Sequence, residues 1–212
     1  MRVAEIKRQT RETDITLSLN LDGSGNHKIS TGIGFFDHML ELFARHALID
    51  LELTCKGDLE VDYHHTVEDV GLVLGAALDQ ALGDRKGIVR YGAIMLPMDE
   101  ARADVLVDLG GRPYLVWKIS HPEQHIRDFN VQLLEEFMRA FCTNARMNLH
   151  VVQPYGAEVH HAYEAVFKGL ARWPLIRVKP AFLRVKGRFE AVFYLFRSTV
   201  KRIEYDGHFA GN

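Results

Sequence analysis

The sequence predicts an α+β fold in which a β-β-α-β-α unit occurs twice, giving two four-stranded sheets with helices packed between them. Three observations lead to this prediction. Alternation of apolar and polar residues, typical of strands, begins each copy. An apolar pattern of a helix followed by a strand at residues 35–53 recurs at 133–151. A His-His-x-x-Glu motif then follows each copy, at 64–68 and 160–164.

The strand that opens each half is predicted to end in a tight turn. Residues 13–21 alternate apolar and polar side chains and run into an Asp-Gly pair. Residues 101–109 alternate in the same way and run into a Gly-Gly pair. Both patterns are typical of a half-buried strand that enters a hairpin turn.

The next elements are a helix and a strand whose apolar positions coincide in the two copies. Phe43 corresponds to Phe141, 98 positions further on, and the apolar spacing is helical first and alternating afterwards. A short loop follows, shorter by two residues in the second copy, and each His-His-x-x-Glu motif then opens a second helix. The chain therefore divides into half-repeats at residues 1–86 and 87–172.

Length and composition restrict the class of protein. The chain has 212 residues and a formal charge of −2, which gives no electrostatic reason to expect nucleic acid or a membrane surface as a partner. The N-terminus has no apolar core of signal-peptide length. The two cysteines, Cys55 and Cys142, have no pairing spacing and are expected to be buried thiols in a reducing cytoplasm.

The His-His-x-x-Glu motif places three metal-ligating side chains at helical spacing. Residues three and four apart share a helix face, so Glu68 lies beside both His65 and His64. The adjacent histidines point about 100° apart and need not bind the same ion. Imidazole with carboxylate suits Mn, Fe, Ni or Zn. One copy would be compatible with a chance polar patch, whereas two copies at equivalent positions of a repeat indicate a metal site.

The repeat extends the candidate ligands to eight, four in each half. His38 lies in the first helix of its half, and its equivalent in the second half is Glu136. The predicted metal ligands are His38, His64, His65, Glu68, Glu136, His160, His161 and Glu164. Eight ligands suffice for two ions with open coordination positions. Because adjacent ligands point apart, we hypothesise metal sites shared between subunits, so that metal binding drives assembly.

Three basic residues are candidates for binding the phosphate of a small-molecule substrate. Arg90 and Arg112 each follow glycines at the end of an element, and Lys168 lies one helical turn beyond Glu164. Guanidinium groups pair bidentately with phosphate oxygens. Taken singly, each residue is more often a solvated surface charge than a phosphate contact.

One glutamate is a candidate general acid or base. Glu12 stands just before the first hairpin strand, and its counterpart in the second half is Glu100. A carboxylate beside a bound metal can transfer a proton to or from a substrate. Position alone does not distinguish it from an exposed glutamate at the start of a strand.

Several segments together resemble the imidazoleglycerol-phosphate dehydratase family over about residues 2–172. The resemblance is carried by TGIGFFDHML at 31–40, DYHHTVED at 62–69, LPMDEA at 96–101, GRPY at 111–114, and His160, His161, Glu164, Phe167 and Lys168. It implies dehydration of D-erythro-imidazole glycerol phosphate to imidazole acetol phosphate in histidine biosynthesis. It also implies a homo-oligomer, built from trimers into a 24-subunit shell, with two Mn²⁺ per active site bound between subunits.

The same resemblance assigns roles to individual residues. Glu12 matches the family's acid–base glutamate, and Arg90, Arg112 and Lys168 match its contacts to the substrate phosphate. Metal binding is implied at His38, His64, His65, Glu68, His160, His161 and Glu164. Position 136 is histidine in many members and glutamate here, and a carboxylate there still provides a ligand.

The segment 173–212 departs from the family pattern and is predicted to be an atypical basic tail. Pro174 is expected to break the preceding helix, and the family's Pro-Ser-Thr/Ser-Lys-Gly segment, which supplies a serine and a lysine to the phosphate, is missing. Two interpretations remain open: a working dehydratase, and a catalytically impaired metal-binding assembly protein of the same fold. A dinuclear hydrolase of another kind fits the ligands but not the surrounding motifs.

Overall fold

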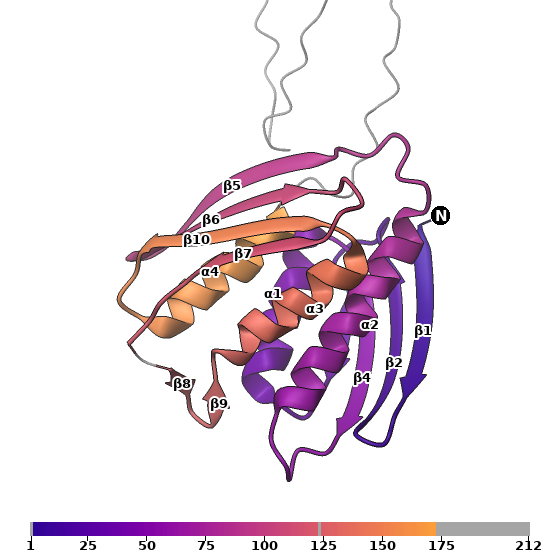
Figure 1. Cartoon of the computed structure of the whole chain (residues 1–212), viewed down its shortest axis with the longest axis horizontal. Helices are drawn as coiled ribbons and strands as arrows, with labels where there is room; N and C mark the ends of the chain where they lie inside the picture. Colours follow the sequence, from indigo (N-terminus) through magenta and orange to yellow (C-terminus); the bar gives the residue numbers. More distant parts are fainter. Residues whose placement is uncertain (1, 123, 173–212) are drawn as a thin grey trace, which may run out of the picture. The chain divides into compact units, whose positions relative to one another are not determined.

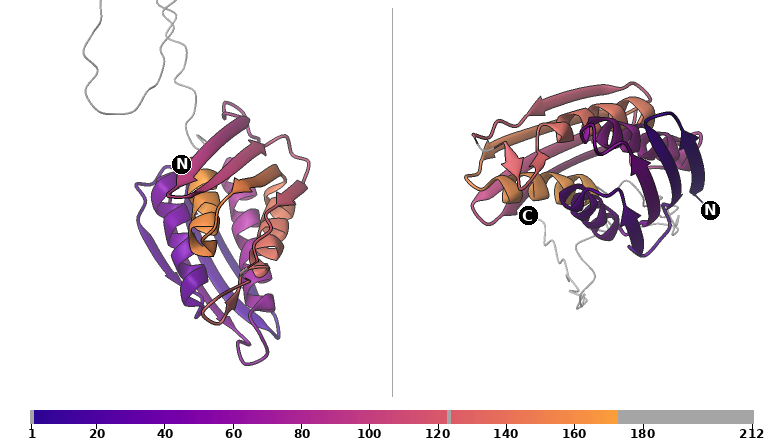
Figure 2. Two further views of the ribbon diagram at one scale, coloured as in Figure 1. Left: turned by 90° about the vertical axis from the view of Figure 1, so that its left-hand side faces the viewer. Right: turned by 90° about the horizontal axis from the view of Figure 1, so that it is seen from below.

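In the computed structural model, which describes residues 2–122 and 124–172, each half of the chain forms one four-stranded sheet and two helices (Figure 1). The helices lie between the two sheets, as the views in Figure 2 also show. The predicted α+β duplication is confirmed. The tail predicted at 173–212 lies outside the described residues.

The first sheet has the strand order β1-β2-β4-β3. Its strands are β1 (Val3–Gln9), β2 (Thr13–Asn20), β3 (His27–Ser30) and β4 (Asp50–Gly57). Strands β3 and β4 run parallel, and the helix α1 (Gly34–Ala47) connects them. Helix α2 (His64–Leu82) follows β4 and packs on β1, β2 and β4. On β2 the alternate residues Ile15, Leu17 and Leu19 are buried, which confirms the predicted alternation.

The second sheet repeats this topology with the order β5-β6-β10-β7. Its strands are β5 (Tyr91–Met98), β6 (Ala101–Asp108), β7 (Tyr114–Lys118) and β10 (Asn148–Tyr155). Helix α3 (Leu133–Ala145) connects the parallel strands β7 and β10, and α4 (Val159–Arg172) follows β10. A small hairpin of β8 (His125–Ile126) and β9 (Phe129–Asn130) lies between β7 and α3 in the sequence.

Each four-stranded sheet contains one strand more than the predicted β-β-α-β-α order. Strands β1 and β5 precede the strands predicted to open each half. The turns after β2 and β6 do not form the predicted hairpins, because β3 pairs in parallel with β4 and β7 pairs in parallel with β10. Strand β3 has only four residues, which is too short for alternation to be distinguished from a loop. Its place in the sheet is decided by pairing with a strand more than 20 residues away.

All four helices begin at the same end of the helical layer (Figure 1). Because β3 and β4 are parallel, the connecting helix α1 must run antiparallel to them, and α2 after β4 runs the same way as α1. The same argument applies to α3 and α4. Helix α2 packs on α3, and α1 packs on α4, so the main helix contacts join the two halves. Among the helices that the structure describes, none has the length and apolar character needed to cross a membrane.

The contacts between helices depend on a glycine and on a group of phenylalanines. A Cβ atom at Gly71 of α2 would lie 2.7 Å from the carbonyl oxygen of Phe137, so glycine permits the close approach of α3. The ring of Phe137 packs against Phe36 of α1 and Phe167 of α4, with centroid distances of 5.2 and 5.8 Å. Helix α3 thereby supports the two helices that carry the most compact group of candidate ligands.

Candidate metal centre

The eight predicted metal ligands lie near the N-terminal ends of the four helices. His38 lies near the start of α1, and Glu136 lies in the first turn of α3. Helices α2 and α4 begin with the two motifs, which contribute His64, His65, Glu68, His160, His161 and Glu164. Since the helices begin at the same end of the layer (Figure 1), the candidate ligands occupy positions at that end. The positive partial charge of helix N-termini favours carboxylates there.

Three of these ligands form one compact group that joins the two halves. His38 of α1 and His160 and Glu164 of α4 each place one ligand atom within 4.8 Å of the others. The Nε2 atoms of His160 and His38 lie 3.1 and 3.6 Å from the same oxygen of Glu164. Two imidazole nitrogens and one carboxylate are donors suited to Mn, Fe or Zn. Within residues 2–122 and 124–172 this is the single group of three or more such ligands.

The carboxylate of this group is largely buried and paired with a lysine. The Glu164 side chain is 10 % exposed, and Lys168, one turn further along α4, donates to its second oxygen. Burial alone would raise the pKa of Glu164, but the hydrogen bond and charge of Lys168, together with the two histidines, hold the pKa below its usual value. Glu164 is therefore ionised, as a metal ligand must be. Lys168, the predicted phosphate contact, lies directly beside the ligand group.

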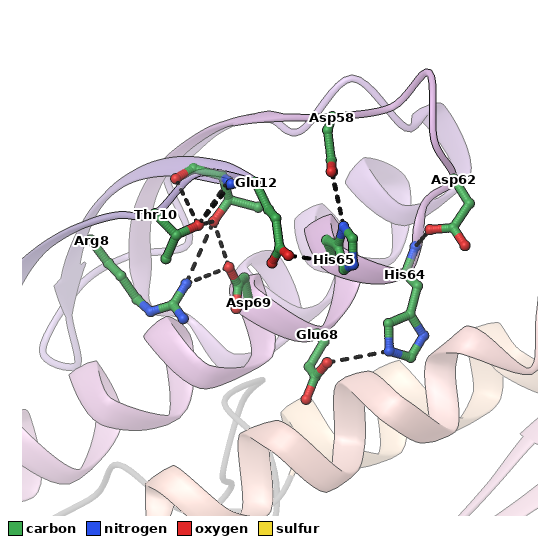
Figure 3. A network of polar contacts seen from close by, with 10 residues as sticks. Arg8, Thr10, Glu12, Asp58, Asp62, His64, His65, Glu68 and Asp69 are labelled. Atoms are coloured by element: carbon green, nitrogen blue, oxygen red, sulfur yellow. Dashed lines mark hydrogen bonds and ion pairs between the residues drawn. The ribbon is translucent and has the colours of Figure 1, made fainter.

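The group at the repeat-equivalent positions, His64, Glu68 and Glu136, is only partly assembled. His64 Nε2 lies 3.3 Å from Glu68 Oε2 on α2 (Figure 3). Glu136 on α3 is directed toward Arg139, whose Nε is 3.7 Å from its carboxylate. The side chains of Glu68 and Glu136 are 45 % and 42 % exposed, in contrast to the buried Glu164. This second group therefore presents an exposed pair of His64 and Glu68.

His65 points away from His64, as adjacent helical positions predict. Their ring planes are 79° apart, with centroids separated by 6.2 Å. His65 Nδ1 lies 3.0 Å from Asp58 Oδ2, and its Nε2 lies 3.8 Å from Glu12 Oε1 (Figure 3). The hydrogen bond to Asp58, with the charges of Glu12 and Asp58, raises the pKa of His65. The contact with Asp58 was not predicted, because a single acidic residue in a loop has no periodic signal.

The turn that carries Glu12 is tied to α2 by polar contacts (Figure 3). The hydroxyl of Thr10 accepts the backbone N–H groups of Glu12 and Thr13 at 3.1 and 3.0 Å. The carboxylate of Asp69 on α2 accepts hydrogen bonds from Arg8 and from the Thr13 hydroxyl. The backbone of Glu12 is therefore held at a set position relative to the first motif helix.

Glu100, the repeat counterpart of Glu12, contacts its histidine in a different way. One oxygen of Glu100 lies 2.8 Å from Nδ1 of His161, and the other accepts the backbone N–H of Glu158 at 2.8 Å. These hydrogen bonds, from His161 first, lower the pKa of Glu100 to about 2. The same bond to Glu100 raises the pKa of His161. Glu100 is thus an ionised carboxylate with both oxygens engaged.

The two predicted phosphate arginines lie at the opposite end of the helical layer. Arg90 follows the C-terminal end of α2 and pairs with Asp108, and its carbonyl accepts the N–H of Leu109. The carbonyl of Arg112 accepts a hydrogen bond from Asn148, just beyond the end of α3. A helix of 19 residues such as α2 is about 28 Å long. The arginines of one chain are therefore too far from its own candidate metal ligands to share one small substrate.

Comparison with known proteins finds a matching family model and related proteins of the same family. The sequence model of imidazoleglycerol-phosphate dehydratase matches residues 31–173. The imidazoleglycerol-phosphate dehydratase of Acetivibrio thermocellus is 56 % identical over 168 residues, which cover 79 % of this chain and 86 % of that protein. The crystal structure of the Staphylococcus aureus enzyme is similar with a TM-score of 0.75 and 37 % identity, covering 83 % of this chain and 98 % of that one. The Pyrococcus furiosus structure, in complex with (S)-C348, has a TM-score of 0.71 and 34 % identity, covering 82 % and 93 %.

Proposed function

The chain belongs to the imidazoleglycerol-phosphate dehydratase family, and we propose that it removes water from imidazole glycerol phosphate to give imidazole acetol phosphate in histidine biosynthesis. The observation that carries this proposal is the group of His38, His160 and Glu164, with Lys168 bound to the carboxylate. The group combines ligands for a divalent cation with an ammonium group suited to a phosphate ester.

We assign two manganese ions to each active site. His38, His160 and Glu164 would bind one ion, and the pair of His64 and Glu68 would begin the second site. The remaining candidates His65, His161 and Glu136 would complete the two sites. Their imidazole and carboxylate donors fit Mn²⁺. When bound, the cations would supply positive charge beside the substrate's imidazole ring and lower the pKa of its N–H, which helps the ring to expel the neighbouring hydroxyl.

Glu12 is proposed as the general acid–base group. The hydrogen to be removed is attached to an ordinary carbon and is not acidic, so its removal needs a positioned base. The Glu12 carboxylate is 53 % exposed and stands on the turn tied to α2, beside His65. Loss of this proton and of hydroxide from the adjacent carbon releases one water and leaves an enol, which becomes the ketone when its hydroxyl proton is lost and a proton is added to carbon.

The separation of the arginines from the metal ligands supports an active site built from several chains. Arg90 and Arg112 would bind the substrate phosphate as bidentate donors at a metal centre of another chain, where Lys168 provides a further positive charge. This arrangement requires a homo-oligomer, for which the family resemblance suggests a 24-subunit shell assembled from trimers. The two buried, unpaired cysteines fit a reducing cytoplasm.

The test is the rate at which the purified, manganese-loaded chain converts imidazole glycerol phosphate to the acetol phosphate. Turnover at the rate of a family member treated in parallel is the expected result. No turnover, with two metals still bound per chain, would instead favour the impaired assembly protein suggested by the atypical tail. No turnover and no metal binding would overturn both.

A further inference from the structure

In both halves a carboxylate contacts Nδ1 of the second histidine of the motif, but the two carboxylates lie in different loops. In the first half Asp58, in the loop between β4 and α2, contacts His65. In the second half Glu100, in the turn between β5 and β6, contacts His161. Glu12 and Glu100 occupy equivalent positions before β2 and β6, yet only Glu100 reaches the Nδ1 side of its histidine.

The difference follows from the length of the loop before the motif helix. Residues 58–63 separate β4 from α2, whereas residues 156–158 separate β10 from α4. The first residue of the longer loop is Asp58, and the first residue of the shorter one is Gly156, which has no carboxylate to offer. Glu100 takes the place of the missing acceptor in the second half.

The contacts of Glu100 are those of a fixed group. Its Oε2 faces His161 Nδ1 and its Oε1 accepts the N–H of Glu158, while Glu158 in turn accepts the N–H of His161 at 2.8 Å. The carboxylate of Glu12 has no hydrogen bond within the described residues and approaches only the opposite ring nitrogen of its histidine, at 3.8 Å. Glu100 is therefore held in place by its contacts, whereas the carboxylate of Glu12 is available to a substrate.

We propose that Asp58 and Glu100 are positioning residues that orient His65 and His161 for metal binding, and that Glu12 alone of the two equivalent glutamates is left for proton transfer. A carboxylate that accepts the Nδ1–H of a histidine fixes the ring orientation and leaves the lone pair on Nε2, the atom then offered to a cation. The equivalent positions of the two halves thus have different tasks, which are proton transfer at Glu12 and orientation of a histidine at Glu100. The inference rests on the proposed function in taking His65 and His161 as metal ligands.

The experiment is a Mn²⁺ titration of the metal-free chain followed by the electron paramagnetic resonance signal of free Mn²⁺, which needs no substrate. Asp58→Ala and Glu100→Ala are each expected to lower the Mn²⁺ affinity of one of the two metal sites about 10- to 100-fold. Asp58→Asn and Glu100→Gln keep an oxygen that accepts Nδ1–H and should recover most of the affinity. Glu12→Gln should bind Mn²⁺ as the wild type does.

Two results would overturn the proposal. One is wild-type Mn²⁺ affinity in both alanine variants, and the other is a loss in Glu12→Gln as large as in Glu100→Ala. Circular dichroism checks folding, and the two alanine variants lie in separate loops, so one remains informative if the other does not fold. Absence of turnover in the wild type would refute the proposed function without altering the titration, so the two failures are distinguishable.

Discussion

Replacing Glu164 by Gln should destabilise the metal-free protein as well as remove a proposed metal ligand. The Glu164 and Lys168 side chains are 10 % and 20 % exposed, so their ion pair is poorly screened by water. Gln keeps the size of the side chain and one acceptor oxygen but removes the charge. The Lys168 ammonium then retains only Met98 Sδ, at 3.7 Å, among its other described contacts.

The size of the effect follows from the difference between a charge-assisted and a neutral hydrogen bond. The former contributes about 1.5–3 kcal/mol and the latter about 0.5–1.5 kcal/mol. A partly buried lysine without a counter-charge adds to the loss, although less than the full cost of a deeply buried ion. We therefore expect Glu164→Gln to lower the free energy of unfolding by about 2 kcal/mol.

The repeat supplies a matched control in Glu68→Gln. Glu68 occupies the equivalent position on α2, but it is 45 % exposed, and the residue four positions later is Leu72 instead of a lysine. Its loss should cost less than about 1 kcal/mol. Urea unfolding at pH 8 with chelator and at one protein concentration compares the variants. Equal destabilisation by both, or none by Glu164→Gln, would refute the assignment of a stabilising Glu164–Lys168 pair.

Four further outcomes are expected. Phe137→Ala should lower the free energy of unfolding by about 3–5 kcal/mol in urea titrations, because the ring is buried between α1, α3 and α4. A loss as small as that on replacing an exposed phenylalanine by alanine would show that Phe137 is not central to the packing. Asp50 accepts the backbone N–H groups of Ser24 and Asn26, and the hydrogen bond from Ser24 in particular lowers its pKa below 3.8. Its contribution to stability is therefore complete above about pH 4 and lost as pH falls through the lowered pKa, so the stability difference between wild type and Asp50→Ala should shrink from pH 5 to about pH 2. Glu12→Gln should assemble with its metal but lose turnover, and a wild-type rate would remove Glu12 from proton transfer. Chelation of the metal should lower the assembly mass in native mass spectrometry, and an unchanged mass would count against sites shared between chains.

Much of the architecture was predictable because the chain repeats itself. Alternating residues in β2 and β6 and helical spacing in α1 and α3 are local patterns, and the second copy confirms each interpretation of the first. Strands β1 and β5 were missed, and the parallel pairing of the short strands β3 and β7 was not predicted because four or five residues carry little periodic signal. Their positions depend on hydrogen bonds to strands that lie distant in the sequence.

Some contacts among the candidate ligands follow from spacing along one helix, and others depend on how the helices pack. Spacing along one helix determines that His64 and Glu68 are neighbours and that His65 points elsewhere, as the structure has them. Spacing does not determine that His38 meets Glu164, because that contact needs α1 of one half to pack on α4 of the other. The partners of the second histidines depend in the same way on the loops that approach each motif.

The sequence by itself determined the duplication, the α+β class, the family and the identity of the candidate ligands, since these follow from residue type and short-range periodicity. Only the tertiary structure decided which candidate ligands lie together, that Glu164 is buried against Lys168, and that the arginines lie a helix length from the candidate metal ligands of their own chain. The physical reason is that apolar surfaces buried between distant segments select the pairing of helices. Burial and pairing then determine the charge state and the reach of each side chain.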